Sequence, residues 1–337
     1  MKVFVTGGGG FLGNAIVQQL VQEGFEVVSY SRNHHKALDK PGIIHCLGNV
    51  ADYEKLKTAM QGCEAVFHIA AKTGIWGNYA SFYEANVTGT ENIIKVCIEL
   101  GIPHLVYTSS ASVVYHGNSE GKDEGLSYPK KYYAPYPQTK AIAEQTVLMA
   151  NGPKLVTCAL RPHLVWGPGD THFLTRLKTR RRKDQLSLLG NKQYLIDTIY
   201  IDNAVSAHLQ ILKKMQTNPG PVAGKAFFIS QDEPISIRSF TNRLLDTMGL
   251  APVNKTMSPG FALFAGWLSQ NVYSLFDIRK EPVLTVFLAR QLSSSHWYDI
   301  SAAKRDFGFI PAVSIDEGMN KLKQWIEING PLPEFEA

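Results

Sequence analysis

The sequence predicts an α/β protein with a doubly wound parallel sheet and a smaller, mostly helical substrate lobe in its C-terminal part. Through residue 230, short apolar runs rich in β-branched residues alternate with stretches of helical spacing. This alternation is typical of a parallel sheet with right-handed crossovers and helices on both faces. Residues 231–300 lose the alternation and are rich in aromatic residues, which predicts the separate lobe.

A glycine-rich turn after the first strand is the feature that most directly indicates a ligand. Gly7, Gly10 and Gly13 follow a buried strand at 3–5 and open a helix that ends at Gly24. Such a turn lets the backbone approach a pyrophosphate closely, and the helix N-terminus offers free N–H groups. Together these features predict a Rossmann dinucleotide-binding unit. The alternative is a tight structural turn that binds nothing.

The end of the second predicted strand, 26–31, indicates which dinucleotide binds. An NAD site usually has Asp or Glu there, bound to the ribose hydroxyls, but this chain has Ser31 followed by Arg32. A carboxylate would repel a 2′-phosphate, whereas a hydroxyl and a guanidinium can bind one. The sequence therefore predicts NADP(H) as the cofactor. A solvated surface arginine is the alternative for Arg32.

Composition indicates a globular protein with a sizeable core. The chain has 337 residues, of which 45% are hydrophobic and 19% are charged, and its net charge of +5 does not imply nucleic acid. Its four cysteines are scattered singly among apolar neighbours, which predicts free thiols in a reducing compartment. The chain enters a strand at once, without a signal-peptide core, and no apolar run reaches the roughly 20 residues of a membrane span. We therefore expect a cytoplasmic protein.

The rest of the chain continues the alternation and then leaves it. Further strands are expected at 43–45, 65–69, 105–109, 156–161 and 225–230, with helices at 53–60, 82–100, 137–151 and 315–327. Residues 116–135 are polar and interrupted by Gly and Pro, which predicts a loop. The predicted dinucleotide-binding domain is 1–168, with 197–230 and 312–328 packed back on it, and the predicted substrate lobe is 169–196 and 231–311.

Tyr136 and Lys140 are the candidate acid–base pair. They stand four residues apart at the start of a predicted helix, so both lie on one face, a turn apart. A phenol has an ordinary pKa of about 10, and a nearby ammonium is expected to lower it toward a useful range. The neighbouring Tyr132 and Tyr133 have no lysine at this spacing.

Ser110 strengthens this interpretation, because a Tyr-x-x-x-Lys match alone often occurs by chance. Ser110 follows a predicted strand, at the carboxyl edge where open α/β sheets bind ligands. A hydroxyl there can hydrogen-bond a substrate carbonyl and stabilise a developing alkoxide. The adjacent Ser109 and Ser112 are expected to be structural. The ten histidines show no H-x-x-x-H or H-E-x-x-H pattern, so we expect no metal.

These motifs resemble the extended branch of the short-chain dehydrogenase/reductases, whose glycine turn also reads T-G-x-x-G-F-L-G. Further stretches resemble the 3β-hydroxysteroid dehydrogenase-like group within it, and they lie at 68–79, 140–145, 166–170, 197–203, 296–298 and 305–311. The resemblance covers nearly the whole chain. It implies that Ser110, Tyr136 and Lys140 are the catalytic residues.

The resemblance also implies two sets of binding residues. Those expected at the cofactor are Gly7, Gly10, Phe11, Leu12, Gly13, Ser31, Arg32, Asn49, Val50, Ala70, Ala71, Lys72, Asn86, Tyr136, Lys140, Pro162 and Leu164. Those expected at the substrate are Trp76, Ser110, Ala111, His163, Trp166, His296 and Trp297. For Asn86, a plain structural role is the equal alternative.

The resemblance implies NADPH-dependent reduction of the β-keto group of a 2-alkyl-3-oxo acid, in hydrocarbon (olefin) biosynthesis, with a tyrosine as general acid. Alternatives are a sterol-4-carboxylate or 3β-hydroxysteroid dehydrogenase, a non-catalytic NADP-binding regulator, and a nucleotide-sugar epimerase. Regulators of this kind usually lose the Tyr or Lys. The apolar residues 259–297 favour a greasy ligand over a sugar nucleotide.

The same apolar region bears on partners. Residues 259–291 form either ordinary core or a cleft for alkyl chains, beside a membrane surface or a pathway enzyme that hands over an insoluble substrate. The basic run 180–183 suits an acidic partner or lipid head groups, although a solvated helix face is favoured. A homodimer is compatible with the resemblance, and a peripheral membrane location with the apolar cleft.

Overall fold

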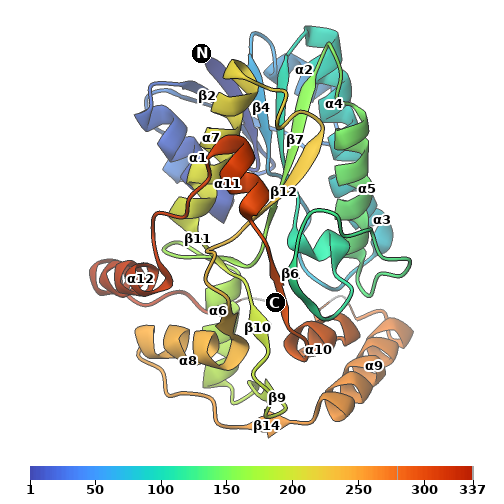
Figure 1. Ribbon diagram of the computed structural model, residues 1–337, viewed down its shortest axis with the longest axis vertical. Coiled ribbons are helices and arrows are strands. Elements are labelled where there is room, and N and C mark those ends of the chain that lie inside the picture. Colours follow the sequence, from blue (N-terminus) through green and yellow to red (C-terminus); the bar gives the residue numbers. More distant parts are fainter. Residues whose placement is uncertain (279, 336–337) are drawn as a thin grey trace.

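The computed structural model describes residues 1–278 and 280–335. A parallel sheet of seven strands forms its centre, in the order β12-β7-β5-β4-β1-β2-β3 (Figure 1). The strand order reverses between the neighbouring strands β1 and β4, because β2 and β3 are added on one side of β1 and the later strands on the other. The predicted doubly wound sheet is confirmed, and its strands are β1 (Lys2–Thr6), β2 (Glu26–Ser31), β3 (Ile43–Leu47), β4 (Ala65–His68), β5 (His104–Thr108), β7 (Val156–Pro162) and β12 (Lys225–Ile229).

Helices cover both faces of the sheet (Figure 1). One face carries α1 (Phe11–Gln22), α7 (Ile201–Thr217) and α11 (Ser301–Phe307). The other carries α2 (Tyr53–Ala59), α4 (Gly89–Leu100) and α5 (Pro135–Met149). The inner strands β1, β4 and β5 are buried along nearly their whole length, as expected when both faces of a parallel sheet are covered, whereas the edge strand β3 is partly exposed.

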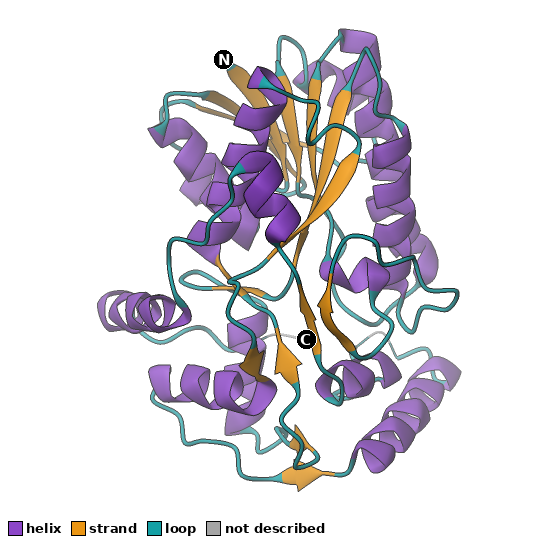
Figure 2. Cartoon of the chain, in the orientation of Figure 1, coloured by secondary structure: helices purple, strands orange, loops and turns teal. Residues whose placement is uncertain are grey.

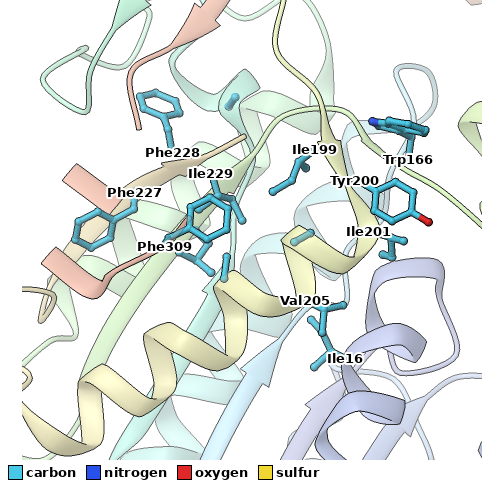
Figure 3. Close-up of a cluster of buried hydrophobic side chains, with 14 of the residues drawn as sticks. Ile16, Trp166, Ile199, Tyr200, Ile201, Val205, Phe227, Phe228, Ile229 and Phe309 are labelled. Carbon is cyan, nitrogen blue, oxygen red and sulfur yellow. The ribbon is translucent and has the colours of Figure 1, made fainter. Parts of the chain in front are cut away.

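The larger core joins this sheet to the lower part of the molecule. Figure 3 shows its middle, where Ile16 of α1 and Val205 of α7 lie near Ile201, and where Phe227 and Phe309 belong to the same cluster. A second core lies under α2, α4 and α5 and includes Phe4 and Tyr107. Burial of this apolar surface is the main favourable term in folding.

Two predicted segments differ from the structure. The helix expected at 82–100 starts earlier and has three parts: α3 (Tyr79–Tyr83), a π-helical turn (Glu84–Thr88) and α4. The loop expected at 116–135 contains a short strand, β6 (Ser119–Lys122), which pairs with β15 (His296–Tyr298). The prediction missed β6 because its backbone partners come from the far end of the chain, which no local pattern reveals.

The C-terminal lobe is mostly helical, as predicted (Figure 2). Its helices are α6 (Phe173–Arg182), α8 (Ile237–Thr247), α9 (Pro259–Leu275) and α10 (Val286–Leu292). The short strands around them are β8 (Val165–Trp166), β9 (Leu188–Leu189), β10 (Leu195–Ile196), β11 (Ile199–Tyr200), β13 (Ile235–Ser236) and β14 (Thr256–Met257).

The last helix, α12 (Ile315–Asn329), contributes Ile315, Met319 and Leu322 to the larger core. It packs against α8 of the lobe, and its Gly318 lies against the rings of Trp166 and Tyr200. The domain boundary proposed at residue 168 therefore stays a prediction. Among the helices of residues 1–278 and 280–335, none is long and apolar enough to cross a membrane.

Candidate functional site

A cavity of about 880 Å³ lies along the carboxyl edge of the sheet. Its walls come from the residues that follow β1, β2, β3, β4, β5 and β7, around the point where the strand order reverses. Ligands of open α/β sheets bind in such a crevice. Every predicted cofactor residue except Asn86 lines the cavity, and so does Ser110.

The glycine turn gives this cavity a floor without side chains. Gly7 has a φ of +71°, and a Cβ there would lie 2.9 Å from the backbone of Ala70. A Cβ on Gly13 would lie 2.1 Å from the Gly7 carbonyl oxygen. The first turn of α1 has no side-chain cap and no acidic residue. Its N–H groups and positive dipole end therefore fit a diphosphate.

A chain of buried hydrogen bonds holds the ends of β1 and β4 together. Thr6 Oγ1 accepts the N–H of Ala70 (3.0 Å) and donates to His68 Nδ1 (2.8 Å). His68 Nε2 in turn donates to Thr90 Oγ1 (2.9 Å), whose own proton goes to the Asn86 carbonyl (2.6 Å). Burial lowers the pKa of His68 to about 3, so the ring stays neutral and keeps this tautomer.

Asn86 lies behind the cavity wall, in the π-helical turn. Its Oδ1 accepts the N–H of Lys72 (2.7 Å), and its Nδ2 donates to the Lys72 carbonyl (3.1 Å) and to Thr139 Oγ1 (3.0 Å). These bonds use both amide protons, and the side chain is 1% exposed. These bonds place Asn86 between the segment after β4 and helix α5, and its predicted contact with the cofactor stays a prediction.

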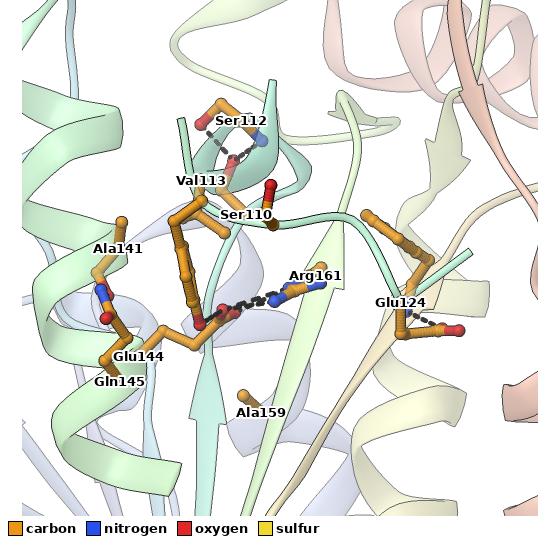
Figure 4. A network of polar contacts seen from close by, with 12 residues as sticks. Ser110, Ser112, Val113, Glu124, Ala141, Glu144, Gln145, Ala159 and Arg161 are labelled. Atoms are coloured by element: carbon orange, nitrogen blue, oxygen red, sulfur yellow. Dashed lines mark hydrogen bonds and ion pairs between the residues drawn. The ribbon is translucent and has the colours of Figure 1, made fainter. Parts of the chain in front are cut away.

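Ser110, Tyr136 and Lys140 meet at one end of the cavity. Ser110 Oγ caps the short helix after β5 by accepting the N–H of Ser112 (3.2 Å), and it lies 2.8 Å from Ser112 Oγ (Figure 4). Lys140 Nζ donates to the Thr108 carbonyl (2.6 Å). Tyr136 and Lys140 share one face of α5, as their spacing predicts.

The pKa of Tyr136 is raised, whereas the sequence predicted that the ammonium of Lys140 would lower it. Burial of the phenol is the main cause, and a hydrogen bond with Ser110 partly opposes it. Burial also lowers the pKa of Lys140 to about 7, with the Glu144 carboxylate opposing. The lysine is therefore only partly charged at neutral pH, which weakens the effect that sequence reasoning assigned to it. A phenol that stays protonated suits a proton donor.

A buried ion pair holds helix α5 on the sheet (Figure 4). Arg161 of β7 donates to Glu144 of α5 through Nε (2.9 Å) and through a terminal guanidinium nitrogen (2.7 Å). Tyr128 donates its hydroxyl to the same carboxylate (2.6 Å). Glu144 is fully buried and Arg161 is 3% exposed. This bidentate contact fixes the register of α5, and therefore of Tyr136, against the strand ends.

Sequence reasoning missed two aromatic cavity residues at the strand ends. Tyr30 donates its hydroxyl to the Asn49 carbonyl (3.2 Å) and covers Gly48, where a Cβ would lie 1.9 Å from the hydroxyl oxygen. His35 covers Gly9 in the same way. The signal for both was a glycine outside the motif positions, which marks a close approach by another side chain. His172, from the lobe, also lines the cavity.

The histidines after β2 form a hydrogen-bonded cluster. The side chains of His34, Asp39 and His45 bring three nitrogen or oxygen atoms within 4.8 Å of one another. His34 Nε2 lies 2.9 Å from an Asp39 oxygen, and His45 Nε2 lies 2.9 Å from Ser31 Oγ. None of these three residues lines the cavity, and His45 ties the cluster to Ser31 at the end of β2.

Trp166 lies in the larger core and outside the cavity lining. It is fully buried, its ring meets those of Tyr200 and Phe240 at 5.2 and 5.4 Å, and its Nε1 donates to Thr198 Oγ1 (3.2 Å) (Figure 3). The short strand β8 turns this side chain inward by pairing with β11. Its role as a substrate contact stays a prediction, and its inward direction is revealed only by the pairing.

The other predicted substrate residues also lie outside the cavity lining. The rings of His163 and His296 are 4.9 Å apart, and burial lowers the pKa of these histidines to about 3 and about 4. Ala111 is buried, and Trp297 is half-buried against Gly121. Trp76 donates its Nε1 to the Ile278 carbonyl (3.0 Å). Only Ser110 of that set reaches the cavity.

Known proteins are similar in sequence to this chain over nearly its whole length. A family profile described as 3-beta hydroxysteroid dehydrogenase/isomerase matches residues 4–259. A 2-alkyl-3-oxoalkanoate reductase of Stenotrophomonas maltophilia is 45% identical over 328 residues, which are 96% of this chain and 98% of that one. A second 2-alkyl-3-oxoalkanoate reductase, of Shewanella oneidensis, is 44% identical, and the match covers 95% of this chain and 85% of that one. A mouse sterol-4-alpha-carboxylate 3-dehydrogenase is 31% identical, with 96% and 90% covered.

Solved structures share the fold at lower identity. MoeE5 in complex with UDP-glucose and NAD has a TM-score of 0.75 and 21% identity, with 98% of this chain and 99% of that chain covered. The epimerase Mth375 of Methanothermobacter thermautotrophicus has a TM-score of 0.78 and 19% identity, with 97% and 92% covered. The chain therefore belongs to the 3-beta hydroxysteroid dehydrogenase/isomerase family, as an oxidoreductase with the extended short-chain dehydrogenase/reductase fold.

Proposed function

We propose that this oxidoreductase uses NADPH to reduce the β-keto group of a 2-alkyl-3-oxoalkanoic acid to a 2-alkyl-3-hydroxy acid. One observation carries the proposal: Ser110, Tyr136 and Lys140 line the same cavity as the glycine turn. Two bacterial proteins named for this activity are 45% and 44% identical to the chain. The more distant sterol dehydrogenases, at 31% identity, make sterol-4-carboxylate oxidation the second candidate.

The residues of the site divide the work of carbonyl reduction. A bound nicotinamide cofactor supplies the hydride. Tyr136 donates a proton to the carbonyl oxygen as negative charge develops on it. Ser110, oriented by Ser112, donates a hydrogen bond to the same oxygen. Lys140 is anchored on the Thr108 carbonyl and lines the same cavity, so its ammonium form can bind the ribose hydroxyls of the cofactor.

The preference for NADPH over NADH rests on the end of β2. A nicotinamide dinucleotide fits the glycine turn, and Ser31 and Arg32 stand where an NAD site usually has an acidic side chain. Arg32 is exposed and lines the cavity. Within residues 1–278 and 280–335 it forms no ion pair and no side-chain hydrogen bond, so its guanidinium is available for a 2′-phosphate.

A substrate panel tests the reaction. Purified protein with NADPH should reduce a 2-alkyl-3-oxoalkanoic acid faster than a 3-ketosteroid, and a UDP-sugar should not react. The kcat/KM should rise as the alkyl chains lengthen, because each buried methylene adds about 0.8 kcal/mol of binding. NADPH oxidation at 340 nm and product mass together measure this. An equal rate from short to long chains would leave only a generic ketone reductase.

We also propose that the outer face of α9 rests on a lipid surface. The helix carries no charged residue from Pro259 to Leu275. Its inner side packs on α10 through Ala262 and Gly266. Its outer face, defined as the exposed apolar side chains of α9, consists of Phe261, Phe264, Trp267, Leu268, Val272 and Leu275. Exposed Trp and Phe on one helix face are typical of interfacial helices.

This placement replaces the apolar cleft expected at 259–291. Among residues 259–278 and 280–291, none lines the 880 Å³ cavity, and the side chains of Phe261, Phe264 and Trp267 are exposed. The end of α9 is nevertheless close to the cavity. Trp76 reaches the Ile278 carbonyl, and Thr73, three residues earlier, lines the cavity. A two-tailed acid drawn from a bilayer under α9 would have a short path to the site.

Vesicle sedimentation tests the outer face of α9. Wild-type protein should co-sediment with phospholipid vesicles, and Phe264→Ser/Trp267→Ser should remain mostly in the supernatant, because two large apolar side chains are lost from the contact. Ile328→Ser, on the exposed surface of α12, is the matched control and should sediment like wild type. Wild-type protein that binds no vesicles but forms a complex with another enzyme of its pathway would exclude the lipid surface.

A further inference from the structure

The imidazole of His35 joins the glycine turn to the end of β2. A Cβ on Gly9 would lie 2.0 Å from His35 Cδ2 and 2.1 Å from His35 Nε2, so the ring rests directly on the turn. Gly9 is not one of the three motif glycines, and its lack of a side chain is explained by this contact. His35 also lines the cavity beside Ser31 and Arg32.

The hydroxyl of Ser31 is committed to the loop. Its single proton goes to the Asn33 carbonyl (2.9 Å), so His45 Nε2, 2.9 Å away, must be the donor in the second contact. Ser31 therefore has no proton for a phosphate unless the Asn33 bond breaks. Ser31 therefore shapes the loop, which revises the phosphate contact that the sequence predicted for it. Arg32 and His35 remain as the cavity-lining groups at the end of β2 that can carry positive charge.

We infer that His35 is a specificity-determining residue that, when protonated, binds the 2′-phosphate of NADPH together with Arg32. The inference rests on the proposed use of NADPH. Histidine changes its charge between pH 5 and 8, and a phosphate monoester becomes dianionic above about pH 6. The preference for NADPH over NADH is therefore largest near pH 6 and falls as the pH rises toward 8.5.

The neighbours of His35 shape this response. His45 lies 6.2 Å from it, ring to ring, and His34 lies 5.3 Å from His45. The pKa of His45 is lowered by burial first and then by its two histidine neighbours, so the three rings interact. The other charged groups of this segment are Arg32, Lys36, Asp39 and Lys40, and Asp39 pairs with His34.

Binding titrations of both cofactors test the inference. NADPH and NADH dissociation constants are measured at pH 6.0, 7.0 and 8.5, with EDTA present, for wild type and His35→Gln. The variant should bind NADPH about tenfold more weakly at pH 6.0, the value of a typical hydrogen bond to a charged group. It should bind NADH within about twofold of wild type, and its preference for NADPH should no longer fall between pH 7.0 and 8.5.

Two further variants separate His35 from its surroundings. His34→Gln is the matched control, because this exposed imidazole is paired with Asp39, and it should keep the wild-type pH dependence. Arg32→Ala should weaken NADPH binding at every pH and keep the slope. In wild-type protein, the NMR titration of the His35 ring should move to higher pH with NADPH and not with NADH, a result that does not depend on any variant folding.

The outcomes distinguish this inference from the cofactor proposal. If wild type prefers NADPH, but His35→Gln has the same preference and slope and the ring titration does not move, His35 is not a phosphate contact and the proposed function stands. If wild type binds NADH at least as tightly as NADPH at all three pH values, both the cofactor proposal and this inference are overturned.

Discussion

Tyr136→Phe should lower the rate of ketone reduction about 10²–10⁴-fold, the usual contribution of a positioned general acid. The phenol of Tyr136 lines the cavity beside Ser110, and its raised pKa keeps it protonated at neutral pH. Loss of one oxygen hardly changes packing, so NADPH affinity should stay within about twofold. Single-turnover reduction with saturating NADPH measures the effect on the chemical step.

Tyr132→Phe is the matched control for this variant. The Tyr132 hydroxyl donates to the Val113 carbonyl (3.1 Å), outside the cavity lining, so its loss should leave at least half of the activity. The pH profile gives a second readout. Because burial lowers the pKa of Lys140 to about 7, its ammonium is lost as pH rises through 7, and kcat/KM should decline above that value. Substantial turnover by Tyr136→Phe would move the acid role to another group.

Glu144→Ala should lower the free energy of unfolding by about 3–5 kcal/mol, the usual cost of removing one partner of a buried ion pair. The change leaves Arg161, which is 3% exposed, as an uncompensated buried charge. It also removes the acceptor of the Tyr128 hydroxyl. Urea unfolding followed by tryptophan fluorescence measures the loss, and activity should fall as well because α5 carries Tyr136 and Lys140.

The double variant Glu144→Leu/Arg161→Met tests the cause of that loss. With both charges replaced by apolar side chains, no unpaired charge remains buried, so much of the stability should return. If the free energy of unfolding of Glu144→Ala lies within about 1 kcal/mol of the wild-type value, water or a rearranged side chain must compensate the charge of Arg161. The close bidentate geometry would then not be what holds α5 on β7.

The sheet and its ligand edge could be predicted because their signals are local. Apolar runs placed every strand of the central sheet within two residues of its observed ends, and the glycine spacing located the diphosphate cradle. Tyr136 and Lys140 share a helix face at any place in the fold, because four residues make about one turn. The predicted cofactor residues other than Asn86, which line the cavity, came from these same signals together with the family resemblance.

Contacts between distant segments could not be predicted in this way. The pairing of β6 with β15 joins residues far apart in the chain, and the pairing of β8 with β11 turns Trp166 inward. Each pairing depends on which distant segment folding brings beside the strand, and the local sequence does not reveal that. The outward aromatic face of α9 has the same origin, because apolar spacing reveals that a helix has an apolar side without revealing whether another element covers it.

The sequence by itself determined the residue types, their spacing along each strand and helix, and therefore the class of chemistry at the edge of the sheet. Tertiary structure decided the states of those residues. Burial raises the pKa of Tyr136 and lowers that of Lys140, and the Asn33 carbonyl takes the proton of Ser31. The physical reason is that solvation and hydrogen-bond partners depend on the neighbours that folding brings together, while periodicity depends only on the order of residues along the chain.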